Sequence, residues 1–219
     1  MSISGYTHVI WDWNGTLLDD VACCIEAINI MLDERRLPTL DSVDAYRRVF
    51  GFPVEQYYRR IGFDFETEPF THVADEYIGL YGDLASQAPL FDDARRILEG
   101  IHAAGVRQIV LSASEVNNLV AQIEPFGIIP LFDEMLGLSD VLGASKIELG
   151  KQYMSRTKPG KALLVGDTIH DKQVADAMEI DCVLVANGHQ SKQTLLSSGA
   201  TVVDRLADVT SIGESGLPF

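Results

Sequence analysis

The chain contains 219 residues, of which 47% are hydrophobic and 22% charged, and its 32 acidic and 17 basic side chains give a net charge of -15. This balance is typical of a folded globular protein and argues against a disordered chain. The length suits one domain, or a domain that carries a smaller insert. Because nucleic-acid backbones are bound by surplus Lys and Arg, the charge argues against a nucleic-acid partner. A phosphate site in such an acidic chain needs local positive charge, which a divalent cation would supply.

The sequence lacks the marks of membrane insertion and secretion. No apolar run approaches the roughly 20 residues that span a bilayer. The first residues, MSISGYTH, contain no basic region followed by an apolar stretch. Cys23, Cys24 and Cys182 are odd in number and do not form a disulfide framework. We therefore expect a cytoplasmic protein without a membrane partner, as a monomer or homodimer, with its thiols packed in the core.

The first predicted strand is THVIWD, from Thr7, and an all-helical interval follows it. Helical patterns cover residues 20–36, 40–50, 53–61 and 68–84, and no convincing strand lies among them. A helical interval directly after a first strand predicts an inserted domain, here residues 18–87. The α/β core then comprises residues 1–17 and 88–219. The two connections, near residues 17–19 and 87–90, would lie side by side and act as a hinge.

Beyond the insert, helical patterns and short apolar runs alternate. A helix is predicted within residues 92–105, where Gly105 ends it. Four further strands are predicted at RQIVLSAS from Arg107, KALLVGD from Lys161, DCVLVANG from Asp181 and ATVVD from Ala200. Continuous apolar runs of this kind are typical of parallel strands buried on both faces. The expected core is a three-layer α/β/α fold with a Rossmann-like parallel sheet.

Reactive side chains stand where three of these strands end. Asp12 ends the first strand, Ser112 lies at the end of the second, and Asp167 follows the strand from Lys161, with Asp171 four residues later. In open parallel sheets, functional groups gather beyond the carboxyl ends of the strands. Lys146 precedes the last of these strands by one helical stretch and could reach the same edge, although Lys151 and Lys158 are alternatives.

These residue types suit the chemistry of a phosphate ester. Asp12, Asp167 and the backbone carbonyl of Asn14 are hard oxygen ligands of the kind that bind Mg²⁺ together with a substrate phosphate. Asp12 could then attack phosphorus and form an aspartyl-phosphate. The phosphoryl oxygens would be held by side chains and by backbone N–H groups, at Gly15, Thr16, Ser112, Ala113 and Lys146.

The motifs DWNGTLLDD from Asp12, VLSAS from Val110, Lys146 and GDTIHD from Gly166 stand in the order of the four signature motifs of the haloacid dehalogenase-like superfamily, which the sequence closely resembles. The helical insert resembles the C1 cap of its phosphoglycolate-phosphatase-like branch, and the resemblance covers nearly the whole chain. It implies a hydrolase with Asp12, Asn14, Ser112 and Lys146 as catalytic residues. It also implies Mg²⁺ held at Asp12, Asn14, Asp167 and Asp171.

Asn14 departs from that family pattern. The resemblance implies an aspartate there, which gives a proton to the leaving oxygen and later activates water. An amide cannot exchange a proton near neutral pH. General acid-base assistance is typically worth about 10² to 10⁴ in rate.

Four hypotheses account for Asn14. The enzyme is a slower phosphatase whose leaving groups need little protonation, as in acyl or aryl phosphates, or whose proton comes from another residue or the substrate. It runs a related reaction, such as phosphonate hydrolysis or dehalogenation. It is a phosphate-binding or regulatory relic. Asn14 partly deamidates to Asp, since Gly15 leaves the attacking backbone nitrogen unhindered. A phospho-accepting signalling domain is a further, non-enzymatic alternative.

Other polar residues are assigned structural roles. His170 and His189 are expected at loop positions that face solvent. Most of Arg47, Arg48, Arg59 and Arg60 are expected in surface ion pairs, which contribute little energy. Tyr46, Tyr57 and Tyr58 are expected to pack between cap helices. The sequence as a whole predicts a Mg²⁺-dependent phosphatase that acts on a small phosphorylated metabolite.

Overall fold

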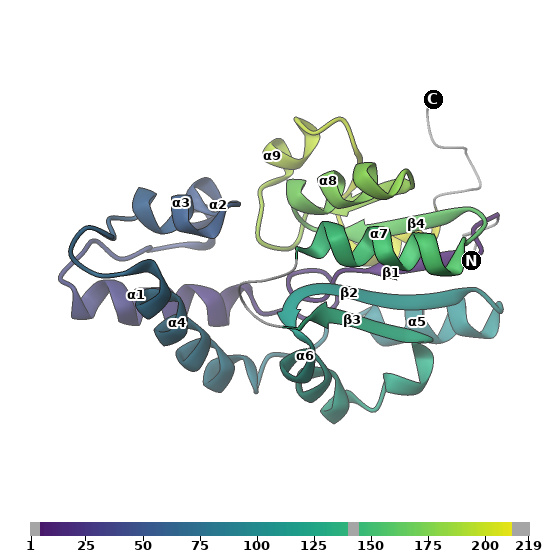
Figure 1. The fold of residues 1–219 in the computed structure, drawn as a ribbon, viewed down its shortest axis with the longest axis horizontal. Coiled ribbons are helices and arrows are strands. Elements are labelled where there is room, and N and C mark those ends of the chain that lie inside the picture. Colours follow the sequence, from purple (N-terminus) through teal and green to yellow (C-terminus); the bar gives the residue numbers. More distant parts are fainter. Residues whose placement is uncertain (1–4, 140–144, 212–219) are drawn as a thin grey trace.

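The core of the protein is a six-stranded sheet with helices on both faces (Figure 1). The structure, a computed structural model, describes residues 5–139 and 145–211. The strands are parallel, in the order β3-β2-β1-β4-β5-β6. Their bounds are β1 His8–Trp11, β2 Arg107–Glu115, β3 Glu134–Leu138, β4 Ala162–Gly166, β5 Asp181–Val185 and β6 Thr201–Val203.

Successive side chains of β1 point to opposite faces of the sheet and therefore belong to two different layers of the core. Val9 and Trp11 join the apolar cluster under α5 (Ala94–Ala103) and α6 (Val116–Ile123). Ile10 joins the opposite cluster, under α7 (Lys146–Thr157) and α8 (Ile169–Met178). The predicted α/β/α class is therefore confirmed.

Short elements complete the core. They are α9 (Lys192–Leu196) and the 3₁₀ turns Glu124–Phe126, Ile129–Leu131 and Leu206–Ser211. Gly105, with φ of 74°, lies in the left-handed region just after α5, so the predicted helix end is confirmed.

The sequence missed β3, which pairs with β2 at the sheet edge. Its residues, EMLGL, alternate poorly between polar and apolar, and only Leu138 is buried. A Cβ on Gly137 would lie 2.7 Å from the Cα of Val116, so the chain needs a glycine where the strand meets α6. A half-exposed edge strand lacks the continuous apolar run by which the other strands were recognised.

The interval after β1 forms four helices, as predicted. They are α1 (Val21–Glu34), α2 (Val43–Val49), α3 (Val54–Arg60) and α4 (Phe70–Ala85). They enclose an apolar cluster of their own, which includes Ile28, Met31 and the predicted Tyr46, Tyr57 and Tyr58. Figure 1 shows these helices as a separate lobe beyond one end of the sheet. We refer to this lobe as the cap.

The two connections between cap and core lie side by side. Leu18 forms an antiparallel bridge with Leu90. Backbone hydrogen bonds join the Asp19 N–H to the Pro89 carbonyl at 2.8 Å and the Phe91 N–H to the Leu17 carbonyl at 3.0 Å. The adjacency matches the sequence expectation, whereas hinge motion and the boundaries at residues 18 and 87 stay proposals.

Within residues 5–139 and 145–211, none of the helices combines the length and apolar character required to cross a membrane.

Truncation of Leu98 tests the packing of α5 against the sheet. Leu98 is fully buried, so Leu98→Ala should lower the free energy of unfolding by about 2 to 5 kcal/mol. Leu196→Ala makes the same change at a side chain that is 56% exposed and should shift stability by less than about 0.5 kcal/mol. Urea denaturation measures both, and equal losses would contradict the packing described.

Candidate active site

The carboxyl ends of the central strands bring the predicted residues together. Asp12 directly follows β1, and its N–H continues the ladder to the Val165 carbonyl at 2.9 Å. Ser112 lies within β2, Asp167 directly follows β4, and Lys146 begins α7. All of these side chains are buried and line one cavity of about 840 Å³ between the core and the cap.

Lys146 is the lysine that reaches the site. Its Nζ lies 2.5 Å from Asp12 Oδ1 and 2.5 Å from Asp171 Oδ1, and the residue is 4% exposed. Lys151 instead pairs loosely with Glu148 at the surface, and Lys158 is the exposed C-cap of α7. Burial disfavours the ammonium, but Asp12 and Asp171 outweigh it and hold the pKa of Lys146 above its ordinary value.

Asp12, Asp167 and Asp171 form an acidic cluster whose ligand oxygens lie within 4.8 Å of one another. Burial raises the pKa of Asp12 to about 8 against the opposing charge of Lys146, and it raises the pKa of Asp167 to about 6. Buried carboxylates that repel one another require positive charge nearby. The donor set of this cluster, hard oxygens without sulfur or imidazole, fits Mg²⁺.

Asp171 is already occupied by protein donors. Its Oδ2 accepts from the Thr168 hydroxyl at 2.7 Å and from the N–H groups of Thr168 and Asp167. Its Oδ1 accepts from Lys146. The capping box of α8 and the lysine thus fix this carboxylate with four protein donors, whereas Asp12 and Asp167 each accept from two.

Gly15 and Thr16 are engaged within the turn rather than free for a phosphate. The Gly15 N–H donates to Asp20 Oδ1 at 2.8 Å and to the Leu18 carbonyl at 3.0 Å. The Thr16 hydroxyl lies 3.1 Å from both Asp12 Oδ2 and Asp167 Oδ1. In this conformation Gly15 therefore offers no spare donor to a phosphoryl oxygen, and the Thr16 side chain orients the two carboxylates.

Gly15 is required by both conformation and space. Its φ is 71°, and a Cβ would lie 2.5 Å from Asp167 Oδ2 and 2.5 Å from His189 Cδ2. The turn can therefore approach Asp167 only because residue 15 has no side chain.

The end of β2 supplies the predicted hydroxyl. Ser112 is 1% exposed, and its Oγ accepts from the Ser114 N–H at 3.1 Å. Ala113 lies beside it in the cavity wall. Both residues stand where the sequence placed them, and their contact with a phosphoryl group stays a prediction.

Every polar group of the Asn14 side chain has a protein partner. Its Nδ2 donates to Asp20 Oδ2 at 3.0 Å and to the Tyr81 hydroxyl at 2.6 Å. Its Oδ1 accepts from the Ser114 hydroxyl at 3.1 Å. Tyr81 in turn donates to Asp20 Oδ2 at 2.6 Å. The amide is thus held by residues of the cap connection, of α4 and of β2.

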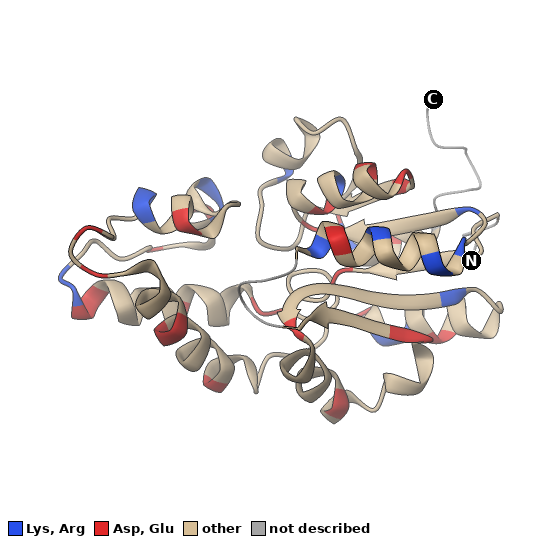
Figure 2. Cartoon of the chain, in the orientation of Figure 1, with Lys and Arg blue, Asp and Glu red and all other residues tan. Residues whose placement is uncertain are grey.

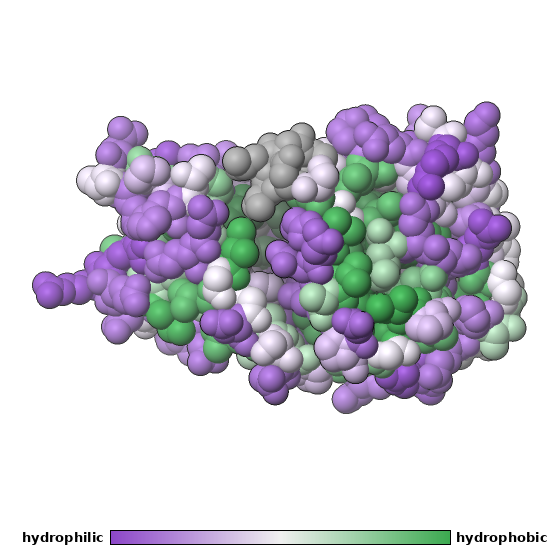
Figure 3. Space-filling model, turned by 60° about the horizontal axis from the view of Figure 1, so that its bottom comes forward, coloured by the Kyte–Doolittle hydropathy of each residue, from purple (hydrophilic) through white to green (hydrophobic). Residues whose placement is uncertain are grey.

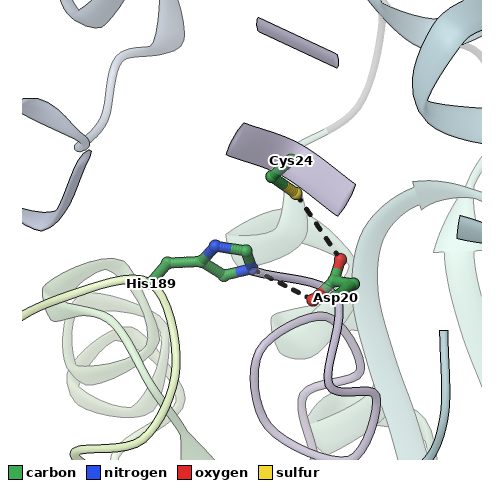
Figure 4. Close-up of side chains that lie close together, drawn as sticks. All are labelled: Asp20, Cys24 and His189. Carbon is green, nitrogen blue, oxygen red and sulfur yellow. Dashed lines mark hydrogen bonds and ion pairs between the residues drawn. The ribbon is translucent and has the colours of Figure 1, made fainter. Parts of the chain in front are cut away.

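Asp20 is a fourth buried carboxylate, which the sequence prediction did not identify. It is fully buried and lies 3.3 Å from Nε2 of His189, while the Cys24 thiol donates to its Oδ2 at 3.7 Å (Figure 4). Burial would raise the pKa of Asp20, but His189 and the hydrogen bonds hold it below the usual value. The acidic pair in LLDD was visible in the sequence, whereas its burial was not.

His189 is buried, so the prediction that it faces solvent was wrong. Burial would lower its pKa, but Asp20 outweighs burial and the pKa rises to about 9. The ring Nδ1 of His189 forms a hydrogen bond with the Tyr46 hydroxyl of the cap at 2.9 Å. The backbone N–H of His189 donates to Asp167 Oδ2 at 2.6 Å. Since both ring nitrogens and the carboxylate partner are satisfied, the Asp20–Cys24–His189 group forms a hydrogen-bonded ion pair rather than a free metal site.

Two further predictions are corrected. His170 lies in the first turn of α8, half-buried, with its ring 4.7 Å from that of Phe52. Arg47 forms no surface ion pair but donates to the carbonyls of Asn187 and Gly188, at 2.7 and 2.8 Å. Arg60 likewise donates to a backbone carbonyl, whereas Arg59 does form the expected ion pair, with Glu55.

Comparison with known proteins identifies the family. Residues 9–185 match the family model described as haloacid dehalogenase-like hydrolase. The chain belongs to this family. The predicted family and hydrolase class are therefore confirmed.

The chain is similar to proteins that are named for different activities. Tyrosine-protein kinase PtkA of Mycobacterium tuberculosis is 26% identical, over 94% of this chain and 71% of its own. Phosphoglycolate phosphatase of Caulobacter vibrioides is 22% identical, over 92% of this chain and 88% of its own. A predicted phosphatase from Clostridium acetobutylicum has the same fold, with a TM-score of 0.79, 19% identity and coverage of 94% and 97%.

Exchange of the Asn14 and Asp20 side chains tests their contact. Asn14→Asp would place two carboxylates at the 3.0 Å contact and should lower the free energy of unfolding by about 1 to 3 kcal/mol. The double variant Asn14→Asp/Asp20→Asn restores one amide and one carboxylate. Its loss of unfolding free energy should be smaller, by at least about 0.5 kcal/mol, than the sum of the losses of the two single variants.

Gln193→Glu is the control, because it makes the same amide-to-carboxylate change on an exposed residue of α9. It should leave stability nearly unchanged. Strict additivity of the two single variants in denaturant titrations would refute the direct contact.

Proposed function

We propose that the protein is a Mg²⁺-dependent phosphatase that acts on a small phosphorylated metabolite through an aspartyl-phosphate at Asp12. The observation that carries this proposal is the buried cluster in which Lys146 bridges Asp12 and Asp171 beside Asp167. Membership of a hydrolase family supports it.

Asp12, Asp167 and the backbone carbonyl of Asn14 would hold the metal. Mg²⁺ supplies positive charge that offsets the repulsion between these carboxylates and an anionic phosphate. The Asp12 carboxylate attacks phosphorus, so that an Asp12–phosphorus bond forms and the bond to the leaving oxygen breaks. The Lys146 ammonium lies against the Asp12 carboxylate and opposes the effect of burial on its pKa, and the metal would add further positive charge that favours the ionised nucleophile. Water then attacks the phosphorylated Asp12 and releases inorganic phosphate.

The Asn14 contacts favour one of the four hypotheses for this position. Both N–H groups of the amide are already donated, and the amide has no proton to give. The contact with Asp20 disfavours deamidation, because the product carboxylate would face another carboxylate. The acids and the lysine of the cluster are all in place, which supports an enzyme rather than a relic. We therefore favour a phosphatase whose leaving group needs little protonation.

The cap, for which we retain the boundaries 18–87, is proposed to close over the site. Tyr46 and Arg47 of α2 already contact residues 187–189 of the core. A cavity of about 840 Å³ between cap and core supports a small-molecule substrate.

Asp12→Asn tests the proposed function. Loss of the nucleophile should reduce Mg²⁺-dependent phosphate release by more than about 10³-fold. Acid quenching of the wild type during turnover should trap one phosphoryl group on the peptide that contains Asp12. Asp93→Asn, a change at the surface N-cap of α5, should retain wild-type activity. Full activity of Asp12→Asn, or turnover insensitive to metal chelation, would exclude this mechanism.

A second candidate is phosphoryl transfer from Asp12 to a hydroxyl acceptor. Asn14 cannot activate water by removing its proton, which favours a longer-lived aspartyl-phosphate. A relative of 26% identity is named a tyrosine-protein kinase. Phosphorylated acceptor alcohol among the products of turnover would support transfer, and inorganic phosphate alone would support hydrolysis.

A further inference from the structure

We propose that the substrate is a small aryl phosphate, in which the phosphate is esterified to a phenolic oxygen on an uncharged ring. This inference rests on the proposed phosphatase function and specifies its leaving group. Two independent observations carry it, the bonding of Asn14 and the composition of the cavity wall.

The first observation concerns the proton that the leaving oxygen needs. The Asn14 amide contacts Asp20, Tyr81 and Ser114 and has no donor left. The Tyr81 hydroxyl donates to Asp20, so it too is engaged. An oxygen that departs beside Asn14 therefore receives no proton from these two side chains, so the site favours an oxygen that leaves as an anion of low basicity and takes its proton from solvent.

Phenolic oxygens meet that requirement better than aliphatic ones. The pKa of a tyrosine-like phenol is about 10. The hydroxyl of an alkyl alcohol is closer to that of water, at about 15.7. As Asp12 forms its bond to phosphorus, the electron pair of the breaking bond goes to the phenolate oxygen. Protonation of that oxygen by solvent completes the first half of the reaction.

The second observation is the apolar character of the cavity beyond the acidic cluster. From the cap it is lined by Phe50, Phe52, Tyr77 and Ile78, and from the core by Pro125 and Phe126. In the space-filling view, a narrow strip of hydrophobic side chains lies at the junction of the cap and the sheet-containing part, and a larger hydrophobic area lies on the sheet-containing part itself (Figure 3). Such walls suit the face of an aromatic ring.

The cations that line the described part of the cavity are already paired, because the His189 ring lies against Asp20 and Lys146 lies against Asp12 and Asp171. Lys146 is the only Lys or Arg among the described residues that line it, and two carboxylates already engage its ammonium. The flanking helices α1, α4 and α6 contain no Lys or Arg, and Figure 2 shows no blue on α4 or α6. Residues 1–4, 140–144 and 212–219 contain none in the sequence either.

Negative charge at the wall adds to this selection. The Glu115 side chain, which caps α6, is among the lining residues. A carboxylate or second phosphate on the leaving group would lack a counter-charge and would face this acid. The neutral polar side chains Ser114, Asn118 and Gln122 could instead bind hydroxyl or amide substituents. The substrate is therefore an uncharged aryl group that carries one phosphate.

Turnover of a graded series of phosphate monoesters tests the leaving-group requirement. The series runs from nitrophenyl through phenyl phosphate to alkyl phosphates and phosphoglycolate, with wild-type protein and Mg²⁺. We expect kcat/KM to fall steeply with leaving-group pKa, with phenyl phosphate exceeding the alkyl esters by at least about 10²-fold. A tyrosine-phosphorylated peptide is included, and its turnover should be slower than that of phenyl phosphate.

The outcomes separate this inference from the proposed function. If no ester released phosphate and Asp12 were not phosphorylated, the proposed phosphatase function itself would be excluded. Turnover in which alkyl esters or phosphoglycolate match phenyl phosphate would leave the phosphatase intact and overturn the aryl specificity. Faster turnover of the peptide would overturn the small-molecule assignment. His170→Gln is tested in parallel, and a slope that becomes steep only in this variant would assign proton donation to His170 and overturn the inference.

A charge placed in the cavity wall tests the second observation. Ile78 lines the cavity from α4 and is 37% exposed, so an arginine there can extend without disturbing the core. Ile78→Arg should raise kcat/KM for a carboxyphenyl phosphate relative to phenyl phosphate by about tenfold, through a new ion pair. Leu196→Arg adds the same charge outside the cavity, on α9, and should leave the ratio unchanged. An unchanged ratio in Ile78→Arg would contradict the placement of the leaving group against α4.

Discussion

The buried ammonium of Lys146 is the interaction on which the arrangement of the site depends. Asp12, Asp167 and Asp171 meet at the carboxyl edge of the sheet, where burial penalises each negative charge. Lys146 contacts Asp12 and Asp171. Asp167 instead accepts hydrogen bonds from the Thr16 hydroxyl and the His189 backbone N–H. Removal of any one partner would leave a buried charge unpaired, which costs more than an isolated surface ion pair contributes. The same excess of acid explains why the cluster suits a divalent cation.

A second buried charge pair, Asp20 with His189, lies next to the turn that follows Asp12, since Asp20 accepts a hydrogen bond from the Gly15 N–H of that turn. It joins the cap to the core, because His189 also bonds Tyr46 of α2 and Asp167 of the acidic cluster. Asn14 bonds the same carboxylate and thus completes this network as a neutral partner. The amide fits this network as a neutral partner of Asp20, whereas the proposed reaction would gain from a proton donor at the same position. Local stability and acid-base chemistry therefore make opposite demands on residue 14.

Much of the fold and of the cluster could be predicted because both follow from local sequence. Apolar runs that end in Asp12 and Asp167 mark strands and place both acids at one edge. The motif order predicted a lysine near the same edge, but only the structure distinguishes Lys146 from Lys151 and Lys158. The network around Asp20 could not be predicted, because it joins residues from distant elements, such as Tyr81 and His189, whose burial depends on cap packing. Strand β3 was not predicted, because it lies half-exposed at the sheet edge and its sequence lacks a continuous apolar run. The Gly15 N–H and the Thr16 hydroxyl form hydrogen bonds within the folded turn that the sequence does not show, and their contact with a phosphoryl group stays a prediction.

Under the proposed function, the two networks together would give selectivity without a positively charged specificity pocket. In an acidic chain, a Lys or Arg in the cavity would have to compete with many carboxylates, and the described wall has none beyond Lys146. Discrimination then falls to desolvation, since an apolar wall accepts a ring and rejects a charge that finds no partner. The chemistry of the turn imposes the same preference, because an amide at position 14 favours oxygens that leave without a proton. In the proposed reaction, a largely apolar wall that carries the acid Glu115 and a neutral residue 14 would thus select for one kind of leaving group, the wall through binding and residue 14 through bond cleavage.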